Sequence, residues 1–270
     1  MGVKEYLDSK KYDGAVKVGK SIPKSKNTAS KQNTPQPVTS TQTATVEVPD
    51  KSKTKDLTLA DVDLIVKAFE KDENLGRFYW GNTDYYMINS KVRQAVQEDR
   101  EDYLSGKITK DEFNNRDDLR YLKQWNPNYA SALAKLEGAM HPMGVQANLY
   151  RYGEWDSDDS KGIVGYDRTF KAMGFDGTAQ SIIGAKMSLD NITSFGYDPN
   201  RSHMKNKDSR NFVLHAVTRP TTQVYAGSYH RRRESEIIAN RGQTLTFYDY
   251  KEEYDSKLKR NIKHFYAYFD

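Results

Sequence analysis

The chain has 270 residues and no cysteine, which excludes disulfide bonds, thiolate catalysis and cysteine-ligated metal sites. Hydrophobic residues make up 36% of it, enough for a packed core, and no stretch of about 18 consecutive apolar residues is present to span a membrane. The net charge of +5 lies within residues 1–56, where 11 lysines stand against 6 acidic residues. Residues 57–270 are electrically balanced, so a nucleic-acid-binding fold is not indicated.

The first 56 residues divide into two segments by composition. Residues 1–18 carry scattered apolar side chains such as Tyr6 and Tyr12, without the apolar core of a secretory signal peptide. They predict either a short peptide that docks to a delivery partner or a frayed terminus. Residues 19–56 are rich in Ser, Thr, Gln, Pro and Lys and contain no aromatic residue. Such a segment cannot bury enough apolar surface to offset its chain entropy, so a disordered linker is predicted.

Helical periodicity begins next. Thr58 and Asp61 have the spacing of a capping box, and Thr109 and Glu112 repeat it further on. Apolar residues recur at helical spacing after each cap and in two further stretches. Four helices are therefore predicted, over residues 59–69, 83–103, 109–125 and 129–140.

After His141 and Pro142 the pattern changes to short runs of β-forming residues. The turn sequence Asn240-Arg241-Gly242 separates two of these runs. Helices followed by mostly sequential strands predict an α+β domain over residues 57–270 with antiparallel sheets. The predicted strands cover residues 148–152, 212–217, 223–226, 236–239, 243–248 and 262–269.

Polar residues occur in three of the strand-like segments, where an ordinary core would not favour them. Arg151 interrupts an apolar run, and Thr193-Ser194 precedes a Phe-Gly turn. Glu234 and Glu236 stand two residues apart. Alternate residues of a strand share a face, so both carboxylates point into one cleft if the strand already begins at residue 234.

The order and spacing of these segments resemble the arginine-specific mono-ADP-ribosyltransferases. That family carries an Arg…Ser-Thr-Ser…Glu-x-Glu signature and is found in actin-modifying binary toxins and bacteriophage transferases. The resemblance covers residues 57–270. Segment 85–93, Tyr-Tyr-Met-Ile-Asn-Ser-Lys-Val-Arg, looks like the family's helical segment, and 234–242, Glu-Ser-Glu-Ile-Ile-Ala-Asn-Arg-Gly, matches the strand and turn after its catalytic loop. It implies a helical N-terminal part followed by a mostly antiparallel ADP-ribosyltransferase β-sandwich around an NAD cleft.

The resemblance implies a role for each motif residue. Glu236 is the catalytic carboxylate that holds the ribose 2′-hydroxyl of NAD⁺, and Arg151 clamps the pyrophosphate. Glu234 engages the guanidinium of the target arginine. The middle motif reads Ile-Thr-Ser here, so the first serine is missing if Thr193 and Ser194 take its second and third positions. A second alignment places Ser194 first, and either residue is a candidate for orienting the catalytic carboxylate.

Further residues are carried over from the same resemblance. Tyr86 and Asn89 are candidate walls of the NAD pocket. Tyr229 and His230 stand in the target-recognition turn, and Arg233 helps to make that turn basic. A basic turn favours a target arginine on an acidic or nucleic-acid-associated protein surface.

The function that follows is transfer of ADP-ribose from NAD⁺ to arginine of a target protein, with NAD⁺ as co-substrate and no metal. The five histidines have no metal-ligand spacing. Three alternatives stay open: an NAD⁺ glycohydrolase, a transferase that modifies nucleic acid, and a silent relative with an eroded serine motif. By analogy with injected proteins, the flexible tail favours action in a host-cell cytoplasm after delivery by a phage particle or a secretion system.

Overall fold

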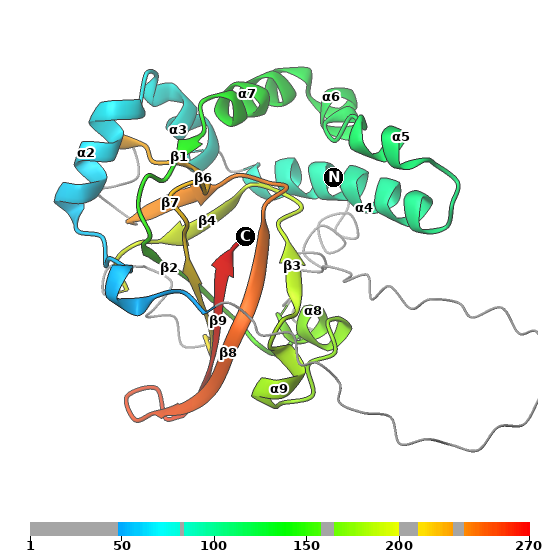
Figure 1. Cartoon of the computed structure of the whole chain (residues 1–270). Coiled ribbons are helices and arrows are strands. Elements are labelled where there is room, and N and C mark those ends of the chain that lie inside the picture. Colours follow the sequence, from blue (N-terminus) through cyan, green and yellow to red (C-terminus); the bar gives the residue numbers. More distant parts are fainter. Residues whose placement is uncertain (1–47, 82–83, 158–164, 200–209, 229–234) are drawn as a thin grey trace, which may run out of the picture.

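The computed structural model describes residues 48–81, 84–157, 165–199, 210–228 and 235–270 (Figure 1). The predictions for residues 1–47 lie outside this range. The helical elements are η1 (Lys51–Lys53), α2 (Leu59–Phe69), α3 (Glu73–Trp80), α4 (Tyr85–Leu104), α5 (Lys110–Asn114), α6 (Arg120–Trp125), α7 (Pro127–Gly138), α8 (Asp167–Ala172) and α9 (Ala179–Ile182). The strands are β1 (His141–Pro142), β2 (Asn148–Gly153), β3 (Lys186–Ser188), β4 (Thr193–Gly196), β5 (Phe212–Val217), β6 (Gln223–Tyr225), β7 (Glu236–Ala239), β8 (Thr244–Asp255) and β9 (Arg260–Phe269).

Helix α2 begins where the capping pattern predicts. The Asp61 backbone N–H donates to the Thr58 hydroxyl at 3.2 Å, and the Thr58 N–H donates to the Asp61 carboxylate at 2.8 Å. These bonds satisfy donors that a helix start otherwise leaves unpaired. Val62 and Val66 bury the inner face of the helix. Residues 50–56, just before this helix, already contact the rest of the structure. The side-chain amide of Asn148 donates to Asp56 at 2.7 Å, and that of Gln146 donates to the Asp50 carbonyl. Contacts with the domain therefore begin ahead of residue 57, where its start was expected.

The predicted helix from 109 to 125 is wrong as a single element. Its cap is present, with the Thr109 N–H donating to the Glu112 carboxylate at 2.7 Å, but α5 ends at Asn114 and α6 is separate. The side chains of Asn115 and Asp117 bond to nearby backbone groups instead. Short polar side chains that bond to the backbone in this way compete with helix continuation.

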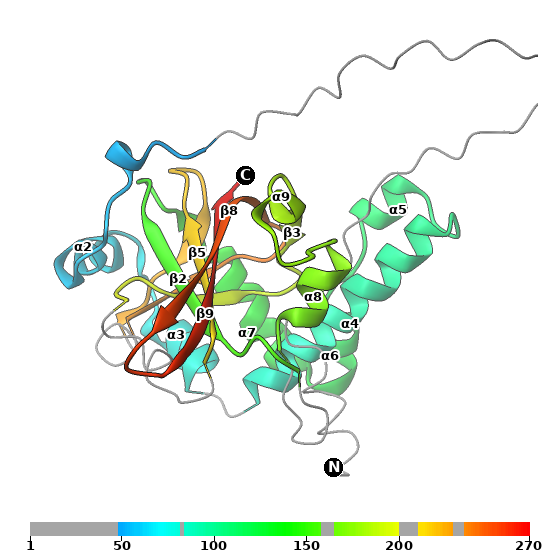
Figure 2. The same cartoon turned by 90° about the horizontal axis from the view of Figure 1, so that it is seen from below.

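Within the residues that the structure describes, nine strands form one continuous sheet in the order β1-β6-β7-β4-β2-β5-β9-β8-β3. All pairs are antiparallel except β5 with β9. The two halves of the expected sandwich are therefore joined, through the pairing of Tyr150 on β2 with Gly196 on β4. The β8–β9 hairpin runs beyond the predicted strands and extends away from helices α4 to α7 (Figure 2).

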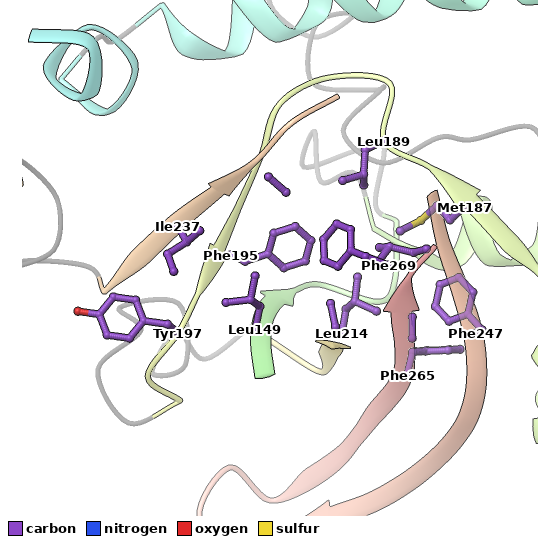
Figure 3. Packing of buried hydrophobic residues seen from close by; sticks show 14 of the residues in the cluster. Leu149, Met187, Leu189, Phe195, Tyr197, Leu214, Ile237, Phe247, Phe265 and Phe269 are labelled. Atoms are coloured by element: carbon purple, nitrogen blue, oxygen red, sulfur yellow. The ribbon is translucent and has the colours of Figure 1, made fainter. Parts of the chain in front are cut away.

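Two hydrophobic cores cover opposite faces of β7. Ile237 packs in the larger core with Phe195 of β4 and Phe269 of β9, whose rings lie 5.8 Å apart (Figure 3). Ile238 packs in the second core, which α3, α4, α6 and α7 build. Because successive strand residues point to opposite faces, these two isoleucines fix the orientation of the whole strand.

A network of charged side chains ties the helices to the turn after β7. Arg241 of that turn is bonded to Asp118, just before α6, and to Glu137 of α7. On α4, Arg100 is bonded to Asp190, which follows β3, at 3.0 Å. Each guanidinium faces a carboxylate, so the partly buried charges are compensated. Among the helices that the structure describes, none combines the length and apolar character needed to cross a membrane.

A histidine pair lies on the face of β5 and β9 that points away from the larger core. His215 stacks on Tyr266 with ring centroids 4.4 Å apart, and its Nε2 lies 2.9 Å from Nδ1 of His264. Burial lowers the pKa of His215 to about 3, and the charges of His264 and Lys251 act in the same direction. The neutral imidazole is therefore the form that the fold accommodates.

This pair predicts that stability falls on acidification. An unfolded histidine binds a proton below about pH 6.5, whereas folded His215 does not, so the unfolded state gains as the pH drops. Between pH 7.5 and 5.5, wild-type protein should lose about 1 kcal/mol more unfolding free energy than His215→Phe in urea titrations. Tyr266→Phe keeps the imidazole and should retain the wild-type dependence. Equal pH dependence in wild type and His215→Phe would contradict the assignment.

Candidate active site

Glu236 opens β7 on the face that looks toward the helices. Two described side chains donate to the same oxygen, Oε2: the Ser194 hydroxyl at 2.6 Å and the Trp80 indole Nε1–H at 3.0 Å. Ser194 reaches it because it pairs with Ile238 across β4 and β7, which places all three side chains on one face. No described residue donates a hydrogen bond to Oε1 of Glu236. Among the described residues, the carboxylate is thus held through Oε2 alone.

Arg151 joins the site from the neighbouring half of the sheet. Its Nη1 donates to the Ser194 carbonyl at 2.9 Å, and its Nε donates to the Tyr166 hydroxyl at 2.6 Å. Ser194 therefore links the two charged residues, with its backbone toward Arg151 and its hydroxyl toward Glu236. The sequence-predicted arginine, serine and glutamate come together here.

Thr193 does not share this position. Its hydroxyl donates to the Asn191 carbonyl at 3.1 Å, and it lies on the same face of β4 as Phe195, which is buried in the larger core. Neighbouring strand residues face opposite ways, so only one of the two hydroxyls can reach Glu236. Of the two candidates for orienting the carboxylate, Ser194 is therefore the one in contact with it, and both alignments of the motif are compatible with this contact.

The backbone turns sharply just before Glu236. Ser235 is 2% exposed and has a φ of 55°, and its carbonyl accepts a hydrogen bond from the Tyr197 N–H at 2.8 Å. This left-handed conformation is uncommon outside glycine and is found at functional sites more often than elsewhere. Because β7 begins at Glu236, the strand rule does not place Glu234 on its face. Four predicted residues lie outside the described ranges: Tyr229, His230, Arg233 and Glu234.

The two candidate wall residues on α4 differ in exposure. Tyr86 is 45% exposed and lies against Tyr85, with ring centroids 3.9 Å apart. Asn89 is buried, and its amide nitrogen donates to the Tyr79 hydroxyl at 3.2 Å. The carbonyl oxygen of Asn89 is buried without a donor among the residues that the structure describes.

Arg210, just before β5, is bonded to the residue that follows Arg151 in β2, although no sequence motif marked it. Its Nη1 donates to the Tyr152 carbonyl at 2.9 Å, while its Nε is buried without a partner in the described part of the chain. Burial lowers the pKa of Arg210, and repulsion from Arg151 adds to this, while Glu154 opposes it.

No sequence pattern marks Trp80 or Tyr166 as a residue of the site. Trp80 stands in the aromatic run Phe78-Tyr79-Trp80, which predicts packing and gives no hint of a hydrogen bond to a residue 156 positions away. Tyr166 lies 15 positions after Arg151, beyond any local pattern. Both contacts exist only once the strands and helices are assembled.

No protein-family model matches this sequence, and a search of curated proteins finds no match either. Solved structures do match. The fold is similar to that of the C3 exoenzyme of Clostridium limosum, with a TM-score of 0.51 and 13% identity over 80% of this chain and 97% of that one.

Two more solved structures are similar at slightly lower scores. C3stau2 from S. aureus, determined with NAD, has a TM-score of 0.49 and 12% identity over 81% of this chain and all of that one, 100%. C3larvin, described as an ADP-ribosyltransferase toxin from Paenibacillus larvae, has a TM-score of 0.48 and 11% identity, covering 80% and 100%. At such identities the likeness concerns the fold alone, and this chain has the ADP-ribosyltransferase fold that its motifs predicted.

Proposed function

We propose that the protein is an NAD⁺-dependent mono-ADP-ribosyltransferase that modifies an arginine side chain of a target protein. The observation that carries the proposal is the carboxylate of Glu236, held through Oε2 by Ser194 and Trp80 within an ADP-ribosyltransferase fold. Arg151 is connected to this carboxylate through Ser194, whose carbonyl accepts a hydrogen bond from the guanidinium. These contacts support an active enzyme over a silent relative, because the hydroxyl of Ser194, one of the two candidates for orienting the carboxylate, donates to it.

The chemistry follows from the fixed negative charge. Cleavage of the bond between nicotinamide and ribose develops positive charge on the sugar, and a carboxylate fixed beside it stabilises the transition state more than the ground state. The Oε1 atom of Glu236 would accept a hydrogen bond from the ribose 2′-hydroxyl. Because Oε2 is already held by two donors, the carboxylate needs little rearrangement during the reaction.

The surrounding side chains fit NAD⁺ as the co-substrate. Arg151 and Arg210 would bind the pyrophosphate, a task suited to planar guanidinium groups. The exposed ring of Tyr86 would provide an aromatic wall for NAD⁺, and the buried Asn89 of the same helix would support that wall. When bound, NAD⁺ supplies the ADP-ribose group, with nicotinamide as the leaving group. The proposed reaction has no metal step.

Arginine specificity rests on the sequence. Glu234 precedes Glu236 by two residues, and in the resembling family a glutamate at this position distinguishes arginine transferases from relatives that carry glutamine. A carboxylate there would pair with the incoming guanidinium and help to remove its proton. The basic run Arg231 to Arg233 favours a target on an acidic or nucleic-acid-associated protein. Action in a host cell after delivery is part of the same proposal.

Separate losses are expected from the two glutamates. Glu236→Gln removes the charge that stabilises the sugar, so NAD⁺ hydrolysis and transfer should both fall by at least about 100-fold. Glu234→Gln should abolish transfer to protein while hydrolysis stays within about tenfold of wild type. Release of nicotinamide measures hydrolysis, and labelling of a host-cell lysate with labelled NAD⁺ measures transfer.

The acceptor decides between the proposal and its alternatives. Mass spectrometry should place the label on arginine, and Glu236→Gln should lose it. Free nicotinamide without labelled protein would favour a glycohydrolase, and labelled nucleic acid would favour the other transferase. Wild-type activity in both glutamate variants would refute the assignment of the site.

Ser194 and Thr193 offer a matched pair on one strand. Ser194→Ala removes a donor to Oε2, so kcat for NAD⁺ hydrolysis should fall about 10- to 100-fold. Thr193→Ala loses a hydroxyl that bonds only locally among the described residues, and kcat should stay within about twofold. Equal losses in both variants, at unchanged Tm, would contradict the assignment of Ser194.

A further inference from the structure

The last residue of α3 reaches the proposed catalytic carboxylate from outside the sheet. The indole Nε1–H of Trp80 donates to Oε2 of Glu236 at 3.0 Å, the same oxygen that Ser194 contacts at 2.6 Å. We propose that Trp80 is a positioning residue, whose N–H holds Oε2 so that Oε1 of Glu236 faces the substrate. This inference rests on the proposed function, because it assigns how that carboxylate is oriented.

The indole lies in a space that two glycines leave open. A Cβ on Gly76 would lie 3.0 Å from Cζ3 of Trp80, and a Cβ on Gly227 would meet the same atom at 3.0 Å. The Gly227 Cβ would also lie 2.8 Å from the Tyr225 ring. Side chains at these positions would push the indole aside, so the backbone of α3 and the segment after β6 both accommodate it.

A second set of contacts fixes this corner independently of Glu236. The Glu70 carboxylate accepts a hydrogen bond from the Ser228 N–H at 2.9 Å and lies 3.4 Å from the Tyr225 hydroxyl. That hydroxyl is also 3.4 Å from the carbonyl of Asp72, the residue that caps α3. The start of α3 is thereby tied to the end of β6. Trp80 therefore stands on a helix whose start is bonded to the sheet.

Two donors on one oxygen have a specific effect on a carboxylate. They restrict rotation about the bond to the carboxyl carbon, because turning the group would break both hydrogen bonds. With Ser194 alone, the group is held at a single point and can turn. Removal of the indole N–H should therefore slow the chemical step while leaving NAD⁺ affinity nearly intact.

The kinetic test compares two identical chemical changes. Trp80→Phe keeps an aromatic ring and removes the N–H, and kcat for NAD⁺ hydrolysis should fall about 10- to 100-fold while KM changes less than about threefold. Trp125→Phe makes the same change at a site that is 36% exposed at the end of α6, and it should match wild type. Wild-type kcat in Trp80→Phe would overturn the inference, as would a rise in KM and loss of Tm without a fall in kcat.

A spectroscopic test uses the full wild-type chain and does not depend on catalysis. The chain has three tryptophans, so each indole N–H signal can be assigned by NMR through single substitutions to phenylalanine. Glu236→Gln replaces the charged acceptor by a neutral amide, so the Trp80 N–H signal should shift in this variant while the Trp125 signal stays in place. A Trp80 signal at the same position in Glu236→Gln and in wild type would overturn the inference even if Trp80→Phe failed to fold.

The two proposals fail in different ways. A wild-type protein that releases no nicotinamide and labels no acceptor contradicts the proposed function. An active wild-type protein whose Trp80→Phe variant keeps full kcat contradicts only the role of Trp80.

Discussion

The guanidinium of Arg151 stabilises the narrow junction between the two halves of the sheet. Among the described residues, the strand pairing between β2 and β4 consists of Tyr150 opposite Gly196. Arg151 adds a charged hydrogen bond to the Ser194 carbonyl beside this pair. A narrow junction leaves room next to it for polar side chains, and the charged bond keeps the strands together there. The candidate site is therefore a property of the sheet itself and does not depend on a loop for its central residues.

The position of Glu236 is decided by hydrophobic burial. Ile237 and Ile238 follow it and enter different cores, so β7 cannot slip by one residue without exchanging its two faces. Exchange would turn the carboxylate into the aromatic core, away from Ser194 and Trp80. The charged network around Arg241 holds the far end of the same strand. Packing thus specifies the orientation of a polar group that packing alone would not retain.

Most elements of the fold could be predicted from patterns between neighbouring residues. Most features that could not be predicted depend on contacts between residues far apart in the sequence. The capping box at Thr58 and the alternation in β5 and β7 depend on neighbours in sequence, so they could be predicted. The break after α5 follows from competing side-chain bonds at Asn115, whose strength relative to the helix depends on the surroundings. Strand alternation with Phe195 could have chosen Ser194 over Thr193, because the apolar ring marks the core face. Nothing in the sequence near Trp80 or Arg210 predicts their distant partners.

Strand β9 is the last in chain order yet lies inside the sheet, between β5 and β8. Its residues Phe265, Ala267 and Phe269 are almost completely buried in the larger core. A nascent chain that has not emerged from the ribosome as far as Phe269 therefore lacks a central strand and cannot close that core. The larger core is completed only after β9 has been made, since pairings between distant segments form late and domains fold as units. Until synthesis has passed β9, the ribosome therefore carries a chain whose larger core is incomplete.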